Sequence, residues 1–435
     1  NPDIISALPD DILIQMLSLM TVREAAMTDC LSTTWRHLWE NVDNLILDSR
    51  AFGMQLLGNL NYRENPELWK YETTRFVHKV NEVLSHHNGS RVKKFIVQFP
   101  LTSAHASEID RWVAFAAASQ AECLLVWLSN RLGMVAAENS ELYNFPLKHF
   151  SDTRGCRLRE LYLCKCSLET VPAKLNGFSC LANLFLNRVQ VVDEVLLNIT
   201  SSLCALRCLR LKRCNELINL KILHTKLVFM DVYHCWGLFS ISIHAEKLEY
   251  LSYEGNEVFI EYECAPILRE LHALFEVDNQ FPVDFMDEFP NLQILTLQFP
   301  SRLNVSHLLH HCGRFAGLRE IILCLLTSWK RSIRSVAYLL KAVPLVETFK
   351  LEVHGNLRPL NKLNIRWPKN FIPTRLRTIK IGGFSGESEL TQLLLFLLKW
   401  SPVLRTLLID THRCCYLGLR KWIRIESEDA TRCKS

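Results

Sequence analysis

The chain has 435 residues, of which 49% are hydrophobic and 22% are charged, and its formal net charge is +5. Its longest apolar stretch, Leu390 to Ile409, is interrupted by Lys399, Pro402 and Arg405, and no segment is of low complexity, so the sequence predicts neither a transmembrane helix nor a disordered chain. A pI of about 8.4 without a concentrated basic face does not indicate nucleic-acid binding. The sixteen cysteines follow no disulfide-framework spacing, which predicts reduced thiols in the nucleus or cytoplasm.

The first predicted helix begins near Pro9. The fixed φ of proline suits a first helical turn, and Asp10 and Asp11 place negative charge at the positive end of the helix dipole. Apolar residues then recur at helical spacing, namely Ile12, Leu13, Met16, Leu17 and Met20. This pattern predicts an amphipathic helix with one apolar face.

Two further short helices are expected before residue 40. Thr21 and Glu24 have the spacing of a capping box, followed by a helix-compatible run at residues 25–31. A third helix is expected to begin after Ser32, Thr33 or Thr34 as its N-cap. Trp35, Leu38 and Trp39 are spaced three and four apart on one side of it. About forty residues cannot bury three apolar faces alone, so part of this surface must rest on the remaining chain or on another protein.

These motifs resemble an F-box, through residues 8–13 (LPDDIL) and residues 30–39 (CLSTTWRHLW). The resemblance implies that the helices dock on a Skp-type adaptor, which joins the protein to a cullin-RING ubiquitin ligase. Family members commonly carry Lys-Arg where this chain has Thr33 and Thr34, a loss of charge expected to weaken the contact. The contact residues that the resemblance implies are Leu8, Pro9, Ile12, Leu13, Leu17, Leu31, Trp35 and Leu38. The alternative is that these helices only cap the domain behind them.

A phrase of the form apolar-x-x-apolar-x-apolar recurs through most of the chain, with successive copies 20 to 30 residues apart. Its first positions are Leu158, Leu181, Leu206, Leu227, Leu248, Leu268, Leu292, Leu318, Val346, Leu376 and Leu404. Weaker copies begin at Val42 and Val92 and surround Leu124, and candidate helices at residues 76–84 and 112–116 separate them. This period is typical of leucine-rich repeats.

Each repeat has two apolar faces that it cannot bury alone, so neighbouring repeats must stack into a curved solenoid with a parallel sheet on the concave side. Cys166, Cys214, Cys235 and Asn256 each lie eight residues after the start of a phrase, at a site that faces backbone groups of the loop ladder. The predicted fold class is therefore α/β, a leucine-rich-repeat solenoid preceded by a small three-helix F-box.

The C-terminal part resembles the FBD region of plant F-box proteins, through residues 373–386 (PTRLRTIKIGGFSG), a helix at 390–400 and residues 402–409. Together with the F-box motif and the repeats, this similarity means that the chain resembles the plant F-box/FBD/LRR-repeat family. The predicted domains are an F-box at residues 1–45, the solenoid at 46–340, FBD-like terminal repeats at 341–412 and a C-terminal tail at 413–435.

No motif indicates catalysis, a metal or an organic cofactor. Residues 164–166 (CKC) lack the two-residue gap of zinc knuckles, and the adjacent ligands at 310–312 (HHC) and 412–415 (HRCC) point in different directions on a strand or helix. The phrases GxGxxG, Walker A, HExxH and GxSxG are absent. The chain is expected not to be an enzyme.

Side chains that alternate with the inward positions of each phrase project from the concave sheet. Aromatic and arginine residues are the usual anchors of protein interfaces. The predicted target-binding residues are Tyr162, Phe185, Arg210, Lys212, Phe229, Asp231, Tyr233 and Tyr250. The alternative is a solvated inner face with incidental aromatic residues.

A basic run without Asp or Glu holds Arg358, Lys362, Arg366, Lys369, Arg375, Arg377 and Lys380. We expect it to be either a solvated loop or a site for an acidic degron or a phosphate-rich ligand. The resemblance adds inositol phosphate as a candidate ligand, because some plant relatives with this architecture hold one inside the solenoid, but it carries over no particular residue.

Together these features predict a substrate-recognition subunit of a Skp-cullin-F-box (SCF) E3 ubiquitin ligase. Its expected partners are a Skp-type adaptor, through it a cullin-RING ligase, and a target protein that the sequence does not identify. Nucleic acid and membranes are not expected partners. The rival hypothesis is a ligand-sensing or scaffolding repeat protein that does not act in ubiquitination.

Overall fold

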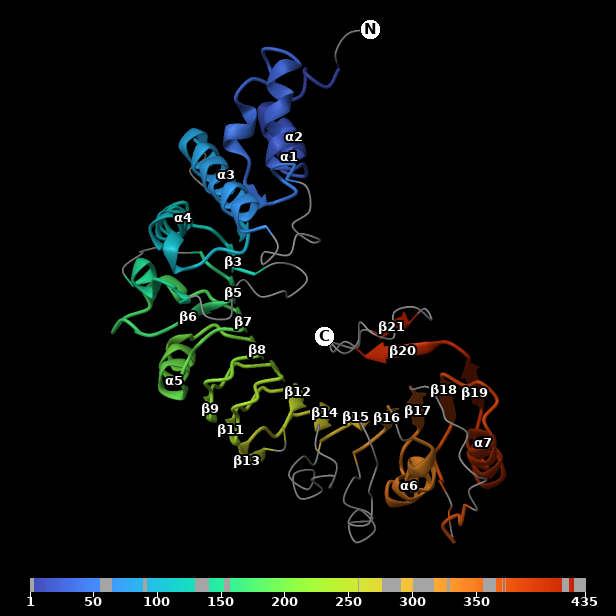
Figure 1. The fold of residues 1–435 in the computed structure, drawn as a ribbon. Helices are drawn as coiled ribbons and strands as arrows, with labels where there is room; N and C mark the ends of the chain where they lie inside the picture. The colour runs from blue at the N-terminus through green and yellow to red at the C-terminus, as the bar shows by residue number, and fades with distance from the viewer. Residues whose placement is uncertain are drawn as a thin grey trace. The chain divides into compact units, whose positions relative to one another are not determined.

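The computed structural model describes residues 4–54, 65–88, 92–129, 141–151, 157–256, 258–275, 291–299, 317–326, 329–354, 365–369, 371, 373–416 and 422–425. The chain divides into two compact units, Asn1–Leu223 (unit 1) and His224–Ser435 (unit 2). Each unit is described by itself. Leucine-rich-repeat strands and helices make up most of both (Figure 1).

Unit 1 begins with α1 (Asp10–Leu17) and α2 (Val22–Met27), followed by the short 3-10 helices η1 (Thr28–Cys30) and η2 (Leu38–Asn41). The expected capping box is present at α2, where the Glu24 N–H donates to Thr21 Oγ1 at 3.3 Å and the Thr21 N–H donates to Glu24 Oε2 at 3.0 Å. The backbone N–H and the hydroxyl of Thr21 lower the pKa of Glu24.

The third helix expected from the sequence is wrong, because residues 33–37 form turns and only the short 3-10 helix η2 follows them. His37 adopts a left-handed conformation with φ of 63°, which an α-helix cannot accommodate. The His37 N–H donates to Asp29 Oδ1 at 3.0 Å, and Trp39 Nε1 donates to Asp29 Oδ2 at 3.2 Å. One carboxylate thus holds this turn in place of a continuous helix.

The rest of unit 1 alternates strands with helices. Its parallel strands, in the order in which they are neighbours, are β1 (Asn44–Asp48), β2 (Lys94–Gln98), β3 (Cys123–Trp127), β5 (Glu160–Cys164), β7 (Asn183–Asn187) and β8 (Cys208–Lys212). The connections contain α3 (Pro66–His86), η3 (Ser103–His105), α4 (Ala106–Ala118), β4 (Tyr143–Asn144), η4 (Leu147–Phe150), β6 (Cys166–Ser167), η5 (Asn176–Phe178), α5 (Asp193–Ser202) and β9 (Asn219–Leu223). Helices α3, α4 and α5 lie on one side of these strands (Figure 1).

Unit 2 continues the same pattern. Its parallel strands, in neighbour order, are β10 (Phe229–Tyr233), β12 (Tyr250–Gly255), β14 (Glu270–Phe275), β15 (Ile294–Phe299), β16 (Glu320–Leu325), β17 (Thr348–Val353), β18 (Thr378–Gly382) and β19 (Thr406–Asp410). Its other elements are β11 (Ser240–His244), β13 (Phe259–Cys264), α6 (Trp329–Ala342), α7 (Ser388–Trp400), β20 (Arg413–Tyr416) and β21 (Trp422–Ile425). The segment expected as a tail from residue 413 thus contains an antiparallel strand pair.

Every copy of the repeat phrase, including the three weak copies upstream, forms a strand of the parallel sheet. The second residues of the first strands, such as Leu45, Phe95 and Leu124, are aligned in register and buried. Removing such a row of apolar side chains from water stabilises the stack by roughly 1.5–3 kcal/mol per side chain. The expected leucine-rich-repeat solenoid with a parallel sheet is therefore confirmed.

The expected loop-ladder positions are also confirmed. Cys214 Sγ lies 3.7 Å from the carbonyl oxygen of Leu186, in the preceding repeat, and Cys166 and Cys235 are buried. Asn256 Nδ2 donates to the Trp236 carbonyl oxygen at 3.2 Å. A small polar side chain at this site satisfies backbone groups that the stacking would otherwise leave without partners.

Candidate functional site

Four of the eight residues expected to contact an adaptor form the core of the N-terminal segment, residues 4–43. Leu13, Leu17, Trp35 and Leu38 are each at most 8% exposed, and Trp35 Nε1 donates to Ser6 Oγ at 2.9 Å. A side chain already covered by its own chain offers almost no surface to another protein. In this structure their side chains hold the segment together, and their expected contact with an adaptor stays a prediction.

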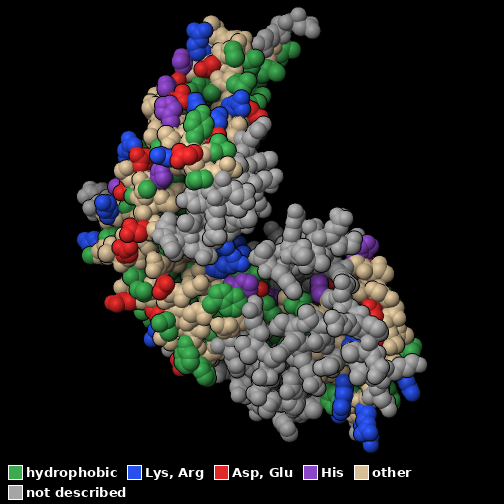
Figure 2. All heavy atoms as spheres, in the orientation of Figure 1, with side chains coloured by type: hydrophobic (Ala, Val, Ile, Leu, Met, Phe, Trp, Pro, Cys, Tyr) green, Lys and Arg blue, Asp and Glu red, His purple; other side chains and the backbone are tan. Residues whose placement is uncertain are grey.

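The other four, Leu8, Pro9, Ile12 and Leu31, lie at the surface, and Leu31 is 67% exposed. The same segment exposes further large apolar side chains, namely Ile4, Ile5, Leu19, Met20 and Met27. Figure 2 shows hydrophobic side chains on the visible part of this segment. Exposed apolar side chains concentrated on one segment are typical of a surface that another protein covers. The N-terminal segment is therefore the first candidate interaction site.

A cleft of about 700 Å³ separates α2 and η2 from α3 within unit 1. Its apolar lining includes Val22, Ala26, Met27, Trp39, Phe52 and Val83. Its charged lining includes Arg75 and Lys79, which pair with Glu72 at 3.4 Å and with Glu82 at 2.7 Å. The paired charges indicate a solvated cleft between two packed elements.

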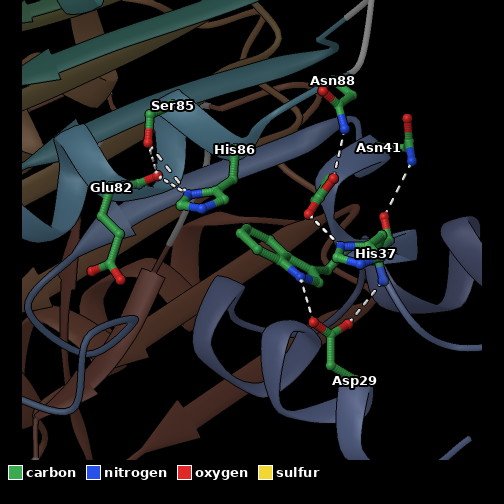
Figure 3. A network of polar contacts seen from close by, with 9 residues as sticks. Asp29, His37, Asn41, Glu82, Ser85, His86 and Asn88 are labelled. Carbon is green, nitrogen blue, oxygen red and sulfur yellow. Dashed lines mark hydrogen bonds and ion pairs between the residues drawn. The ribbon is translucent and has the colours of Figure 1, made fainter.

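A polar network near this cleft joins the N-terminal segment to the end of α3 (Figure 3). The buried Glu40 carboxylate lies 2.7 Å from His37 Nδ1 and accepts a hydrogen bond from Asn88 Nδ2 at 2.5 Å. The Asn88 N–H also donates to the Glu40 carbonyl oxygen at 2.8 Å, and His87 Nε2 lies 2.9 Å from the Val42 carbonyl oxygen. These contacts fix the N-terminal segment on the first repeat.

The second candidate site is the open face of the sheet in unit 1, which carries the first, third and fifth residues of each strand. Tyr162, Phe185 and Arg210 are third residues aligned on β5, β7 and β8, and all are half-buried. The rings of Tyr162 and Phe185 lie 5.9 Å apart and those of Trp127 and Phe185 6.3 Å apart. The structure thus brings the expected residues of unit 1 onto one surface.

A hydrogen bond orients Tyr162 at the start of this surface. Its hydroxyl donates to Glu160 Oε2 at 3.1 Å, and burial followed by the Glu160 charge raises the pKa of Tyr162 to about 12. Lys212, the fifth residue of β8, lies at the other end of the strands and is half-buried. From β5 to β8 the face therefore carries Glu160 at the strand starts, the aromatic rings in the middle and Lys212 at the strand ends.

Unit 2 holds the remaining four expected target-binding residues, Phe229, Asp231, Tyr233 and Tyr250, which are all half-buried. The rings of Phe229 and Tyr250 stack at 4.4 Å. Four of the eight expected residues thus lie in each unit. The third residues of β12, β14, β15 and β16 are buried, namely Ser252, His272, Thr296 and Ile322, whereas those of β17, β18 and β19 are half-buried or exposed.

The structure places the basic run only in part, because Arg358 and Lys362 lie outside the described residues. Arg366, Lys369 and Arg375 are exposed. Arg377 lies 3.8 Å from a carboxylate oxygen of Glu347, and Lys380 is exposed on β18. None of the contacts described for these five side chains indicates a shared anion site, so that expectation stays a prediction.

A group of cations at the ends of three strands was not expected from the sequence. Lys165, Arg188 and Arg213 directly follow β5, β7 and β8, each with a positive φ between 52° and 59°. All three lie seven residues after the first position of a repeat. An alignment of the repeats with one another would therefore have shown a basic residue at this position. We call these residues, together with Lys212, the basic edge.

Among the described residues, no group of three or more His, Cys, Asp or Glu side chains could hold a metal ion. Residues 310–312 and the side chains of 413–415 lie outside this description. Within the same described part of the chain, no helix combines the length and the apolarity that crossing a membrane requires.

Comparison with known proteins identifies the repeats. Residues 83–434 match the family model of the At1g61320/AtMIF1 LRR domain. The chain belongs to this leucine-rich-repeat family. The match covers the strands and helices from the end of α3 to the last strand pair, so the At1g61320/AtMIF1-type LRR domain accounts for most of both units.

Relatives from Arabidopsis thaliana extend the similarity to the N-terminal segment. The chain is 24% identical to F-box/FBD/LRR-repeat protein At1g13570, over 94% of the chain and 92% of that protein. It is 38% identical to F-box/LRR-repeat protein At4g14103 over 21% of the chain and 22% of that protein. It is 26% identical to F-box protein At5g03100 over 51% of the chain and 59% of that protein. The resemblance to plant F-box/FBD/LRR-repeat proteins is thus confirmed.

Proposed function

We propose that this LRR-family chain is the non-catalytic substrate-recognition subunit of an SCF ubiquitin ligase. The observation that carries the proposal is the division of the N-terminal segment into a buried core and an exposed apolar set, which includes Leu8, Ile12 and Leu31. The similarity to Arabidopsis F-box proteins supports an F-box role for this segment. An exposed apolar segment at the end of a repeat array supports a role in docking.

The two parts of the chain then divide the work. The N-terminal segment binds a Skp-type adaptor, and the open face of the repeats binds a target protein. The network around Glu40 fixes the segment on the first repeat, which limits the positions that a bound target takes. The rate of ubiquitin transfer rises because the target lysines and the ubiquitin-loaded enzyme are held together. We propose no metal or organic cofactor and a nuclear or cytoplasmic location.

The proposal is tested by charging the exposed set and measuring adaptor binding. Ile12→Glu and Leu31→Glu are each expected to weaken the affinity for a Skp-type adaptor at least about thirtyfold, because hot-spot side chains contribute about 2 kcal/mol or more. The combined change of Leu8 and Pro9 to alanine is expected to abolish co-purification. Leu395→Glu on α7 is the matched control, because the exposed fraction of Leu395, 61%, is similar to the 67% of Leu31.

Circular dichroism melting curves establish that each variant is folded. If the wild-type chain does not bind an adaptor, or if Leu31→Glu and Leu395→Glu bind it equally well, the proposal is wrong. The scaffolding hypothesis then takes its place, with the N-terminal segment acting as a cap.

A further inference from the structure

The basic edge lies at the carboxyl ends of three neighbouring parallel strands of unit 1. Lys165, Arg188 and Arg213 occupy the same position in successive repeats, and Lys212 precedes Arg213. Neighbouring strands lie about 4.8 Å apart, so the edge spans roughly 10 Å. Figure 2 shows Lys and Arg side chains gathered beside the position of β7 and β8 in Figure 1.

The backbone at these positions is unfavourable for a residue with a side chain. Their φ values of 59°, 52° and 54° lie in the left-handed region, which costs about 1 kcal/mol for residues other than glycine. Glycine or asparagine would form the same turn at less cost. The Lys165 N–H and the Arg188 N–H continue the ladder by donating to Asn187 and Lys212 carbonyl oxygens at 3.0 and 2.7 Å. The turn alone therefore does not account for three basic side chains.

The cations of the edge are close enough to influence one another. Burial and the neighbouring Arg188 lower the pKa of Lys165, and burial and Arg213 lower the pKa of Arg188. Burial raises the pKa of the Cys164 thiol to about 12, against the opposing effect of Arg188, Lys165 and Lys212. Cations from three successive repeats thus lie in one row at the ends of β5, β7 and β8.

A polar side chain lies in the same row. Asn187 is 8% exposed and is aligned in register with Cys164 on one side and Lys212 on the other. Its Oδ1 has no hydrogen-bond partner among the residues that the structure describes. A buried amide oxygen without a partner costs free energy, so Asn187 is a polar group kept in this row at a cost in stability.

The aromatic residues of the open face lie beside the basic edge. Trp127 is aligned in register with Cys164, whose own register partner is Asn187, and its ring lies 6.3 Å from that of Phe185. Tyr162 and Phe185 form an edge-to-face pair at 5.9 Å. Inorganic phosphate gains little from aromatic rings, whereas a peptide that carries apolar and acidic side chains uses both features.

We propose that the open face of unit 1 binds an acidic peptide segment of the target protein, with its carboxylate or phosphate groups on the basic edge and its apolar side chains on Trp127, Tyr162 and Phe185. This inference rests on the proposed function and names the class of substrate. Charge-assisted hydrogen bonds to arginine supply the specificity for the anionic groups, and the aromatic rings supply apolar area.

The experiment measures binding of a fluorescein-labelled peptide of glutamate residues interrupted by phenylalanine to the full chain. The double variant Arg188→Gln/Arg213→Gln is expected to weaken binding about tenfold or more, because it removes two charge-assisted contacts. The control is Arg159→Gln/Arg207→Gln, which removes the same charge from exposed residues just before β5 and β8. The control is expected to change the affinity less than about twofold, as surface charges contribute little.

Three further probes separate the sources of affinity. A peptide with serine in place of phenylalanine, and tripolyphosphate, are both expected to bind at least about fivefold more weakly. A peptide with phosphoserine in place of glutamate is expected to bind at least as tightly as the glutamate peptide, and its preference over glutamate identifies phosphate as the anionic group. Phe185→Ala is expected to weaken the phenylalanine peptide about fivefold and tripolyphosphate not at all.

Equal loss in the basic-edge variant and its control overturns the inference, because binding would then follow net charge alone. Tripolyphosphate binding as tight as that of the phenylalanine peptide also overturns it. Adaptor co-purification is measured on the same preparations. A chain that binds the adaptor but not the peptide contradicts only the inference, whereas a chain that does not bind the adaptor contradicts the proposed function.

Discussion

The open face differs between the two units although both are built from the same repeat. In unit 1 the third residues of the strands, from Ile46 on β1 to Arg210 on β8, are half-buried or exposed. In the middle of unit 2, on β14 to β16, the equivalent residues His272, Thr296 and Ile322 are at most 8% exposed, whereas Asp231 on β10 is half-buried and Lys380 on β18 is exposed. The repeat motif therefore specifies the strand and its buried face. Contacts with other segments of the chain decide whether the opposite face of the strand is accessible.

A charge placed at the same strand position in both units tests whether the two faces differ in accessibility. Thr296→Lys buries an ammonium group at a site that is 3% exposed and is expected to destabilise the chain by about 3 kcal/mol or more. Ile46→Lys, at a site that is 38% exposed, is expected to change stability by less than about 1 kcal/mol. Urea unfolding of both variants checks this. Equal losses would mean that the two faces do not differ.

The burial of His272 in unit 2 also predicts that the stability of the chain depends on pH. Burial lowers the pKa of His272 from 6.5 to about 3. As the pH falls, the unfolded chain takes up a proton near pH 6.5 and the folded chain does so only near pH 3, so this histidine lowers stability throughout that window. The expected slope is about 1.4 kcal/mol per pH unit, and above about pH 7 the effect is absent.

The measurement is the difference in the free energy of unfolding between about pH 7.5 and about pH 5. His272→Gln is expected to lose roughly 2 kcal/mol less than the wild type over this interval. His78→Gln, at an exposed position on α3, is expected to behave like the wild type. If His272→Gln keeps the pH dependence of the wild type, His272 is not the buried neutral group that the fold implies.

The smallest expected effect compares the turns that follow the strands. Arg213→Gly relieves a left-handed backbone with φ of 54° in unit 1 and is expected to raise the free energy of unfolding by about 0.5 kcal/mol. His234 occupies the equivalent position in unit 2 with φ of 51°, and its Nε2 lies 3.1 Å from Glu254 Oε1. His234→Gly is expected to bring no gain, because it removes this contact. Thermal unfolding of the two variants checks the difference, and a gain in both would mean that the Glu254 contact contributes nothing.

Part of the N-terminal segment was predictable and part was not. The Thr21 and Glu24 capping box follows from spacing alone, because both bonding groups lie within one helical turn. The division of the predicted contact residues into buried Leu13 and Trp35 and exposed Leu8 and Leu31 does not, because all four are large and apolar. The left-handed turn at His37 depends on the side chain of Asp29, which no local pattern indicates.

The amphipathic helix α6 shows a different kind of omission. Its apolar residues Trp329, Ile333, Val336 and Leu340 recur at helical spacing and are buried, so the pattern was present in the sequence. The residues of the basic edge were also recognisable in the sequence, because Lys165, Arg188 and Arg213 occupy the same position in successive repeats. The proximity of the basic edge to Trp127 and Phe185 could not be predicted, because it depends on the register between strands.

The sequence by itself determined the repeat, because a side-chain period of two and a spacing of 20 to 30 residues allow a parallel stack and few alternatives. It also determined which residues face the interior. Only the tertiary structure decided which apolar residues of the N-terminal segment stay exposed and where the basic edge meets the aromatic rings. The physical reason is that burial and convergence depend on contacts between distant segments, whereas the periodicity of a strand depends on its own residues.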